Sequence, residues 1–230
     1  MMDFLQNSTF FGVFISVLAY VFGTLLQKRF KSPLCNPMVV ALILTILTLV
    51  VLGIDYKTYE AGTKYITFFL TPATVCLALP LYEQFNVLKK NYKAVLLGIL
   101  SGVASSLLVI AVFAVILGFT HEEYATFLPK SITTAIGMAV SEELGGYPGL
   151  AAAIIAITGI SGNMMAETVC KLFRITEPMA KGIAIGSASH VMGTTKAMEM
   201  GPVEGAMSSL SIVVSGVLTV LAATVFGYLI

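Results

Sequence analysis

Six long stretches of the chain carry no charged side chain, and they define its expected architecture. They cover residues 4–27, 32–54, 65–82, 94–120, 144–166 and 205–230. A helix needs about 20 residues to cross the roughly 30 Å of hydrocarbon in a bilayer, and each stretch is close to that length or longer. The pattern therefore predicts an all-α integral membrane protein with about six transmembrane helices.

Two further uncharged stretches, 131–141 and 182–195, are short and rich in Gly, Ala, Ser and Thr. Irregular backbone at membrane depth survives only where protein shields it or where it lines a cavity. Gly-interrupted segments of this kind mark the binding sites of many transporters. We expect two broken or re-entrant helical segments, near 127–146 and 178–198. The alternative for each is an ordinary loop or a short interfacial helix.

The second half of the chain is weakly self-similar. Thr133-Thr134 opens one copy and Thr194-Thr195 opens the other. Each pair is followed by a four-residue stretch that begins with glycine, GLAA at 149–152 and GAMS at 205–208. A hydroxyl residue and a glycine come next, at 158–159 and 215–216. Since small residues are frequent here, chance similarity is the alternative. We expect an inverted-topology repeat, as in many secondary transporters.

Basic residues indicate the orientation, because Lys and Arg gather at the cytoplasmic ends of membrane spans. Eight of them fall on one side if the short segments are re-entrant: Lys28, Arg29, Lys31, Lys89, Lys90, Lys93, Lys171 and Arg174. We expect a single transmembrane domain over 1–230. Its three N-terminal spans, within 1–93, would serve as scaffold and in oligomerisation, and 94–230 would form the transport core.

Composition excludes several classes of protein. Hydrophobic residues make up 57% and charged residues 11% of the chain, and the mean hydropathy is +0.94. Soluble domains are about 25% charged, so a soluble or disordered chain is excluded. A net charge of +1 favours no nucleic acid. Two histidines, three separated cysteines and no P-loop, GxSxG or HExxH motif predict neither an enzyme nor a metal site. The only expected cofactor is a coupling H⁺ or Na⁺.

The first candidate site is the sequence LPKSITT at 128–134. Proline interrupts a helix, and hydroxyl groups next to the break can coordinate an ion or a carboxylate. A half-helix that begins near Ser131 would point its positive end at the break, and Lys130 would add a full charge. Alternatively, Ser131 is a helix N-cap and Lys130 extends to the membrane interface.

The second candidate site is the sequence GSASHVMGTTK at 186–196. His190 is expensive to bury at membrane depth and titrates near neutral pH, so it would bind substrate or relay a proton. Alternatively, serine or backbone oxygens satisfy its ring in a packing contact. Asn163 and Glu167 share one helix face, which we expect to line the cavity. The predicted substrate- or ion-binding residues are Lys130, Ser131, Thr133, Thr134, Asn163, Ser189, His190, Thr194, Thr195 and Lys196.

These two motifs, with EELGG at 142–146 and EGAMSSL at 204–210, resemble the LrgB/CidB family. The chain departs from it at Ala135, where many relatives have proline, and at Thr195-Lys196, where a small residue and Arg are common. The resemblance implies a multi-pass protein of the bacterial cytoplasmic membrane, holin/antiholin-like, that modulates murein hydrolase export and autolysis. It also implies a smaller LrgA/CidA-type partner. Relatives are implicated in moving small carboxylates, including pyruvate and glycolate/glycerate.

We expect the two broken segments to dip into the bilayer from opposite leaflets and to meet, with Thr134 close to Thr195, in one shared polar pocket. Polar groups concentrated in this way suit one occluded site per protomer. We therefore expect a transporter of small monocarboxylates that works by alternating access. Its partners would be the lipid bilayer, the carboxylate and a second copy of the chain in a dimer, with no nucleic acid. One alternative is a holin/antiholin-like pore or regulator of murein hydrolase export, and another is a passive scaffold for the LrgA/CidA-type partner.

Overall fold

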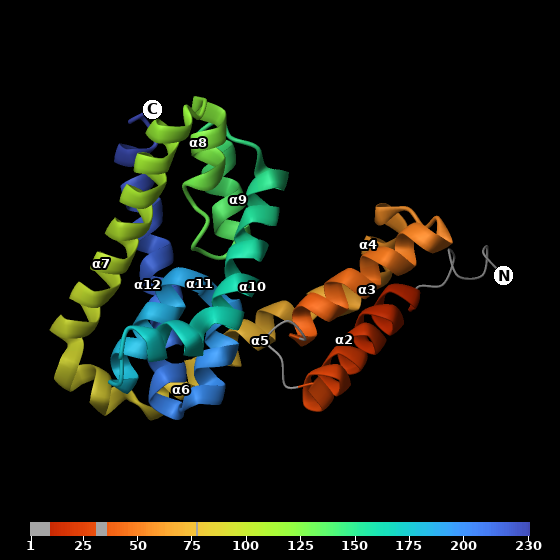
Figure 1. Ribbon diagram of the computed structural model, residues 1–230, viewed down its shortest axis with the longest axis horizontal. Helices are drawn as coiled ribbons and strands as arrows, with labels where there is room; N and C mark the ends of the chain where they lie inside the picture. Colours follow the sequence, from red (N-terminus) through yellow and green to blue (C-terminus); the bar gives the residue numbers. More distant parts are fainter. Residues whose placement is uncertain (1–9, 31–35, 77) are drawn as a thin grey trace. The chain divides into compact units, whose positions relative to one another are not determined.

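The computed structural model describes residues 10–30, 36–76 and 78–230, and every regular element in these ranges is an α-helix. This confirms the predicted all-α class. The chain divides into two compact units, Met1–Cys76 and Leu77–Ile230 (Figure 1), and each is described by itself. The predicted boundary at residue 93, and the scaffold role of the spans before it, stay predictions.

Most of the long uncharged stretches are helices of membrane-spanning character. Among the described residues, four helices are long and apolar enough to cross a bilayer, and they correspond to the first, fourth, fifth and sixth stretches. They are α2 (Phe11–Phe30), α7 (Phe85–Leu117), α10 (Pro148–Leu172) and α12 (Pro202–Phe226). The second stretch contains the shorter apolar helix α3 (Pro37–Leu52).

The third stretch differs from the single helix that we expected. It is divided among α4 (Tyr56–Phe68), α5 (Leu70–Cys76) and α6 (Ala78–Glu83). Pro72 and Pro80 lie four residues after the last residues of α4 and α5. Because proline has no N–H to bond the carbonyl four residues earlier, each helix ends at that point.

In the first unit, glycines bring α2 close to its neighbours. A Cβ on Gly12 would lie 2.8 Å from the carbonyl oxygen of Tyr59 in α4, and one on Gly23 would lie 2.8 Å from that of Pro37 in α3. The hydroxyl groups of Ser16 and Tyr59 are 2.8 Å apart and hydrogen-bonded. Small residues of this kind allow membrane helices to pack closely without a large apolar core.

The second unit is built along the kinked helix α7. Its 33 residues would extend about 50 Å if straight, which exceeds the thickness of the hydrocarbon layer. Asn91 interrupts the helix with φ −118° and ψ 16°, and its side-chain amide donates to the carbonyl of Val87 at 3.0 Å. The kink separates a short segment that carries Lys89 and Lys90 from the long uncharged part.

The first broken segment is a helical hairpin. It consists of α8 (His121–Phe127), a turn over 128–133 and α9 (Thr134–Glu143), and we call it the first hairpin. Thr120 and Glu123 form a capping box that fixes the start of α8. His121 Nε2 lies 2.9 Å from the carbonyl oxygen of Leu144, directly after α9. The two ends of the hairpin therefore lie together, and its turn is the tip.

The second broken segment lies within α11 (Pro178–Met200), which we call the second hairpin. His190 breaks this helix with φ 42° and ψ −140°. A Cβ on Gly193 would lie 3.1 Å from the carbonyl oxygen of Ile185, although eight residues of straight helix advance about 12 Å. The chain therefore folds back at His190 into an inner arm (178–189) and an outer arm (191–200).

The two hairpins are followed by equivalent helices that run in opposite directions. Both α10 and α12 have 25 residues and begin with proline. The His121 ring contacts backbone oxygens just before α10, at Leu144, and after α12, at Ile230. The first hairpin enters the unit from that end, and the second hairpin enters from the opposite end (Figure 1). This is the inverted repeat that the sequence predicts.

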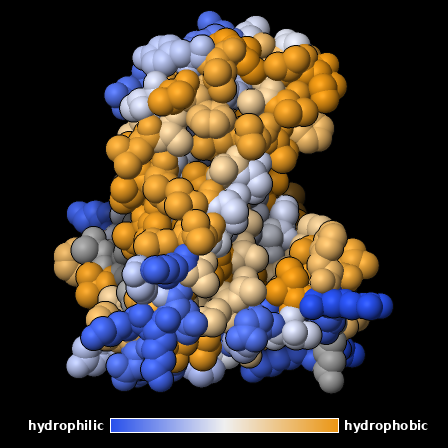
Figure 2. Space-filling model, turned by 90° about the vertical axis from the view of Figure 1, so that its left-hand side faces the viewer, coloured by the Kyte–Doolittle hydropathy of each residue, from blue (hydrophilic) through white to orange (hydrophobic). Residues whose placement is uncertain are grey.

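The outward face of α7 is apolar along its length, as expected for a surface in lipid. Figure 2 shows a hydrophobic face above a hydrophilic end. The buried face of the same helix forms the core with α12 and the first hairpin. Exposed apolar residues of α7 include Leu97, Leu100, Leu108, Val112 and Val115. Lys89, Lys90 and Lys93 are exposed near its start.

Candidate functional site

The tip of the first hairpin places a lysine against two serine hydroxyls. Lys130 Nζ donates to Ser131 Oγ at 3.0 Å and to Ser106 Oγ of α7 at 3.4 Å. The two hydroxyls also lie 3.1 Å apart. Ser131 is 8% exposed, and Lys130 is half-buried. Since Ser106 lies near the middle of the uncharged stretch 94–120, this cation lies at the depth of the membrane interior.

Lys130 has no carboxylate partner among the residues that the structure describes. A charge at the centre of a bilayer costs roughly 2.5–3.5 kcal/mol or more unless it is compensated. The serine hydroxyls offer dipoles to the ammonium group but no negative charge. The tip is therefore a site of unbalanced positive charge, so it favours an anion.

The two threonines after the tip occupy the start of α9. Thr133 is the N-cap of α9 without a side-chain capping bond, and Thr134 is the first helical residue and is exposed. The helix therefore begins later than our expectation near Ser131, because the turn continues through the bond from Ile132 N to Pro129 O at 3.2 Å. Ser131 is not an N-cap, and it bonds to Lys130 and Ser106 instead.

The break in the second hairpin is tied to both long helices of the repeat. His190 is 3% exposed, and its Nε2 lies 3.0 Å from the carbonyl oxygen of Ile155 in α10. Thr194 Oγ1 donates to the His190 carbonyl at 3.0 Å and lies 2.7 Å from Ser208 Oγ of α12. A backbone oxygen thus forms a hydrogen bond with the His190 ring. This agrees with the alternative given above, in which the ring makes a packing contact.

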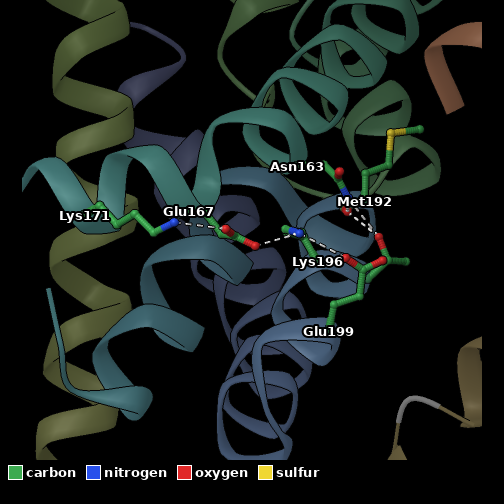
Figure 3. A network of polar contacts seen from close by, with 7 residues as sticks. Asn163, Glu167, Lys171, Met192, Lys196 and Glu199 are labelled. Carbon is green, nitrogen blue, oxygen red and sulfur yellow. Dashed lines mark hydrogen bonds and ion pairs between the residues drawn. The ribbon is translucent and has the colours of Figure 1, made fainter. Parts of the chain in front are cut away.

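The outer arm of the second hairpin is held to α10 by polar contacts (Figure 3). Asn163 Nδ2 donates to the Met192 carbonyl at 2.7 Å and to Thr195 Oγ1 at 3.0 Å. One residue before Asn163, Gly162 leaves room for Ser189, because a Cβ there would collide with the serine side chain. Asn163, Ser189 and Thr195 therefore lie together, as candidate residues of one site should.

Lys196 belongs to an ion network that joins the outer arm to α10. Its Nζ lies 2.8 Å from Glu167 Oε1 and 3.0 Å from Glu199 Oε2, and Lys171 Nζ lies 3.4 Å from the other oxygen of Glu167 (Figure 3). The Lys196 side chain is 24% exposed. Asn163 and Glu167 share one face of α10, as predicted, and that face contacts the outer arm. The charge of Lys196 is thus balanced, whereas that of Lys130 is not.

Both hairpins approach the same parts of α7 and α10. A Cβ on Gly102 of α7 would lie 2.8 Å from Ser187 Oγ of the second hairpin, and one helical turn later Ser106 meets the first hairpin. On α10, the Ile155 carbonyl accepts from His190, and the Ile155 side chain fills the space beside Gly137 of α9. Both hairpins thus reach neighbouring turns of α7 and of α10 within this unit.

Thr134 and Thr195, which we expected to meet, are both exposed in the protomer. Within the described ranges, no hydrogen bond joins the first-hairpin residues Lys130, Ser131, Thr133 and Thr134 to the second-hairpin residues Ser189, His190, Thr194, Thr195 and Lys196. The candidates therefore form two groups, one at each tip.

Three functional groups escaped the sequence reasoning. Ser106 is one of several serines on a long apolar helix, and only its position four residues after Gly102 connects it with the hairpins. Ser208 lies in the EGAMSSL motif, where nothing distinguishes it from Ser209. The third is the backbone carbonyl of Ile155, which leaves no trace in the sequence.

Two cavities flank the second hairpin. One of about 590 Å³ lies between α7 and the inner arm, and its lining includes Gly98, Ser101, Gly102, Ser105 and Ser187. The other, of about 680 Å³, lies at the end where α10 finishes and α11 begins. Its charged lining residues are Glu167, Lys171, Arg174, Lys181 and Glu204. This second cavity opens at the end that the basic residues assign to the cytoplasm.

At the opposite end of the unit, the backbone oxygens of Ile230 and Leu144 raise the pKa of His121 above its ordinary value of 6.5. The ring nitrogens lie 2.7 Å and 2.9 Å from these oxygens. Both nitrogens can donate only when the ring is protonated. The protonated form is therefore the one that links α8 to the ends of α9 and α12.

These features define a class: an α-helical, multi-pass membrane protein in which two inverted helical hairpins bring polar tips to the middle of a bundle. The sequence model of the LrgB-like family matches residues 16–229, so the chain belongs to this family. It is thus a multi-pass membrane protein of a family related to murein hydrolase regulation. No solved structure matches the chain.

Proposed function

We propose that this protein is a secondary transporter of small monocarboxylates that works by alternating access, and that it is not an enzyme. The observation that supports this most directly is the pair of hairpins that enter the second unit from opposite ends. Their tips carry Lys130, Ser131 and the His190 break, and Lys130 also bonds to Ser106 in the middle of α7. Broken helices of this kind provide the midplane binding sites of many transporters.

The proposed roles follow from the chemistry at each tip. Lys130 and the hydroxyls of the first hairpin suit a carboxylate, because an ammonium and O–H groups all donate to oxygen. The second hairpin offers oxygens from His190 and Thr194, and α12 adds that of Ser208. These oxygens suit Na⁺. The His190 ring instead suits H⁺. One of these two cations would couple to the substrate, and no other cofactor is required.

Alternating access requires contacts that break and re-form without unfolding. The contacts of the outer arm with α10 meet this requirement, since they are an ion pair at Glu167 and hydrogen bonds from Asn163. The outer arm also touches α12, at the Thr194–Ser208 hydrogen bond and where Gly205 lies beside Met198. The inner arm packs more tightly on α12, because a Cβ on Gly182 or Gly186 would collide with its backbone carbonyl oxygens. We propose that the outer arm moves while the inner arm stays packed.

Reconstitution tests the function. The purified protein in proteoliposomes should take up radiolabelled pyruvate, lactate or glycolate when a pH or Na⁺ gradient is imposed. His190→Ala should reduce this uptake while the protein remains folded by size-exclusion chromatography. If neither gradient drives uptake of any of these monocarboxylates, the transport proposal fails.

Family membership favours a second candidate, a holin/antiholin-like pore or regulator of murein hydrolase export. A pore of that kind should release solutes much larger than pyruvate, and its activity should not depend on His190. Leakage of a fluorescent dye of several hundred daltons from the same vesicles separates the two. Carboxylate uptake without dye release supports the transporter, and dye release with no gradient-driven uptake supports the pore.

The cellular setting is proposed on the same basis. The protein would lie in the cytoplasmic membrane of a bacterium as a homo-oligomer, with a dimer as the simplest form, beside a smaller LrgA/CidA-type membrane protein. The apolar outer face of α7 suits contact with lipid or with such a helix. Co-purification of the two proteins from membranes, with the mass of the complex measured by light scattering, tests this setting.

A further inference from the structure

We propose that the substrate carboxylate binds at the tip of the first hairpin, on Lys130 together with Ser131 and Ser106, and that Lys196 takes no part in holding it. This assignment rests on the transport function proposed above and adds a ligand from α7. It also distinguishes Lys130 from Lys196. The sequence alone does not separate these two lysines, because Lys130 directly precedes a run with hydroxyl residues and Lys196 directly follows one.

The first argument concerns charge. The ammonium group of Lys130 can donate three hydrogen bonds, and its partners are two serine hydroxyls. Within 10–30, 36–76 and 78–230, no Asp or Glu oxygen lies within 4.0 Å of it. A cation at membrane depth is normally paired. The remaining N–H and the unbalanced charge are therefore available to an anion that enters the site.

Lys196 provides the contrast within the same molecule. Two carboxylates already contact its ammonium group, Glu167 at 2.8 Å and Glu199 at 3.0 Å. An incoming carboxylate would have to displace one of them and would be repelled by the other. Lys196 therefore fastens the outer arm to α10, and its role in transport is to hold and release that arm.

The number of donors also specifies the class of substrate. One ammonium and two hydroxyls can surround a single carboxylate, whose two oxygens accept several hydrogen bonds. α9 begins four residues after Lys130 with no side-chain cap on its N-terminus, and helix N-termini favour negative charge. A second carboxylate on the same molecule would have no cation beside it at this tip. The site should thus select monocarboxylates over dicarboxylates.

Calorimetric titration of the purified full-length protein with pyruvate tests the assignment independently of transport. Lys130→Met should weaken binding at least about tenfold, since a charge-assisted hydrogen bond to a carboxylate is lost. Ser106→Ala should weaken it by a smaller factor, about threefold or more. Lys196→Met should change the affinity by less than about threefold, since its ammonium group is already paired with two carboxylates. The exposed Lys171→Met serves as the matched control with wild-type affinity. Malonate should bind at least about tenfold more weakly than pyruvate.

Thermal unfolding of the same variants shows whether Lys130 binds the substrate or maintains the fold. Without ligand, Lys130→Met should have a melting temperature equal to or above that of the wild type, because the unbalanced charge is removed while the Ser106–Ser131 hydrogen bond remains. Pyruvate should raise the melting temperature of the wild type and leave that of Lys130→Met unchanged. A lower melting temperature for ligand-free Lys130→Met would assign Lys130 a structural role and overturn the proposal.

Other results also decide the question. Wild-type affinity in Lys130→Met, or a larger loss in Lys196→Met, contradicts the assignment, as does a wild type that binds no monocarboxylate. Malonate binding as tight as pyruvate binding contradicts the substrate class. Lys130-dependent binding with no uptake in vesicles supports the site while the transport function fails. Uptake that is insensitive to Lys130→Met supports the transport function, while the assignment of the carboxylate site to Lys130 fails.

Discussion

At the scale of single residues, His190 combines a chemical and a conformational feature. The sequence identified it as a candidate because a histidine among glycines and hydroxyls is rare at membrane depth. The sequence did not show that its backbone is itself the break, with φ 42°, since a positive φ outside glycine depends on the surrounding contacts. The carbonyl of Ile155 and the hydroxyl of Thr194 supply these contacts.

Replacing His190 by glycine or by alanine separates the two features. Both variants lose the ring and its bond to Ile155, but only glycine adopts positive φ without strain. His190→Gly should therefore be more stable than His190→Ala by about 1 kcal/mol. Chemical unfolding in detergent measures the difference. If the alanine variant is as stable as the glycine variant, the backbone at this position is not strained.

A second residue-scale prediction concerns pH. The raised pKa of His121 means that the folded protein binds this proton more tightly than the unfolded chain does. The resulting stabilisation is complete below about pH 6.5, the ordinary histidine pKa, and is lost as pH rises through the raised value. The melting temperature of the wild type should exceed that of His121→Gln by a margin that shrinks across this window. If the difference in melting temperature between the two proteins grows with pH, the raised pKa of His121 is contradicted.

The candidate residues themselves were partly predictable. Lys130 and Ser131 do make contact, because their motif lies at a break. Asn163 and Thr195 do bond to each other, because the face of α10 that carries Asn163 contacts the outer arm. Ser106 could not be found, since a serine on an apolar helix looks the same whether it faces lipid or a hairpin. The expected meeting of Thr134 and Thr195 did not follow from the sequence, because the tips contact α7 and α10 rather than each other's threonines.

At the scale of elements, close contacts at glycine determine how the second hairpin packs. A Cβ on Gly186 would collide with the carbonyl oxygen of Ser208 in α12, whereas one on Gly149, near the start of α10, meets nothing within 4 Å. The spacing of Gly182 and Gly186, four residues apart, is of the kind that permits close packing of membrane helices. It could not name α12 as the partner, since every helix in this chain has small residues.

Alanine substitutions test this packing. Gly186→Ala should destabilise the protein by about 1–3 kcal/mol, because the backbone of α12 must move away. Gly149→Ala, the matched control, should be neutral or slightly stabilising, since alanine favours the helix. Melting temperatures of the two variants in one detergent provide the comparison. Equal losses at both positions would show that the inner arm does not rest on α12.

The boundaries of the elements show where sequence patterns succeed and where they do not. Uncharged length identified α2, α7, α10 and α12, because the bilayer requires it. The same criterion counted 65–82 as a single span, although prolines at 72 and 80 divide it. Both prolines are visible in the sequence. Interior proline kinks or breaks a helix, because it cannot bond the carbonyl four residues earlier, and applying this rule would have corrected the prediction.

At the scale of the whole molecule, the inverted repeat of the second unit is the feature from which the proposed function follows. The weak sequence similarity indicated it, and the equal lengths of α10 and α12 with opposite directions support it. If the hairpins entered from the same side, they would close one entrance only. In the proposed mechanism, entry from opposite sides would give each side of the membrane its own gate.

The sidedness of the two hairpins is the most direct test of this account. Glu122→Cys lies at the base of the first hairpin and Lys171→Cys at the base of the second, and each is introduced singly after the native cysteines Cys35, Cys76 and Cys170 are replaced by serine. In right-side-out and inverted membrane vesicles, a membrane-impermeant maleimide should label the two positions from opposite sides. Labelling of both positions from the same side would contradict the inverted hairpins and the alternating-access mechanism built on them.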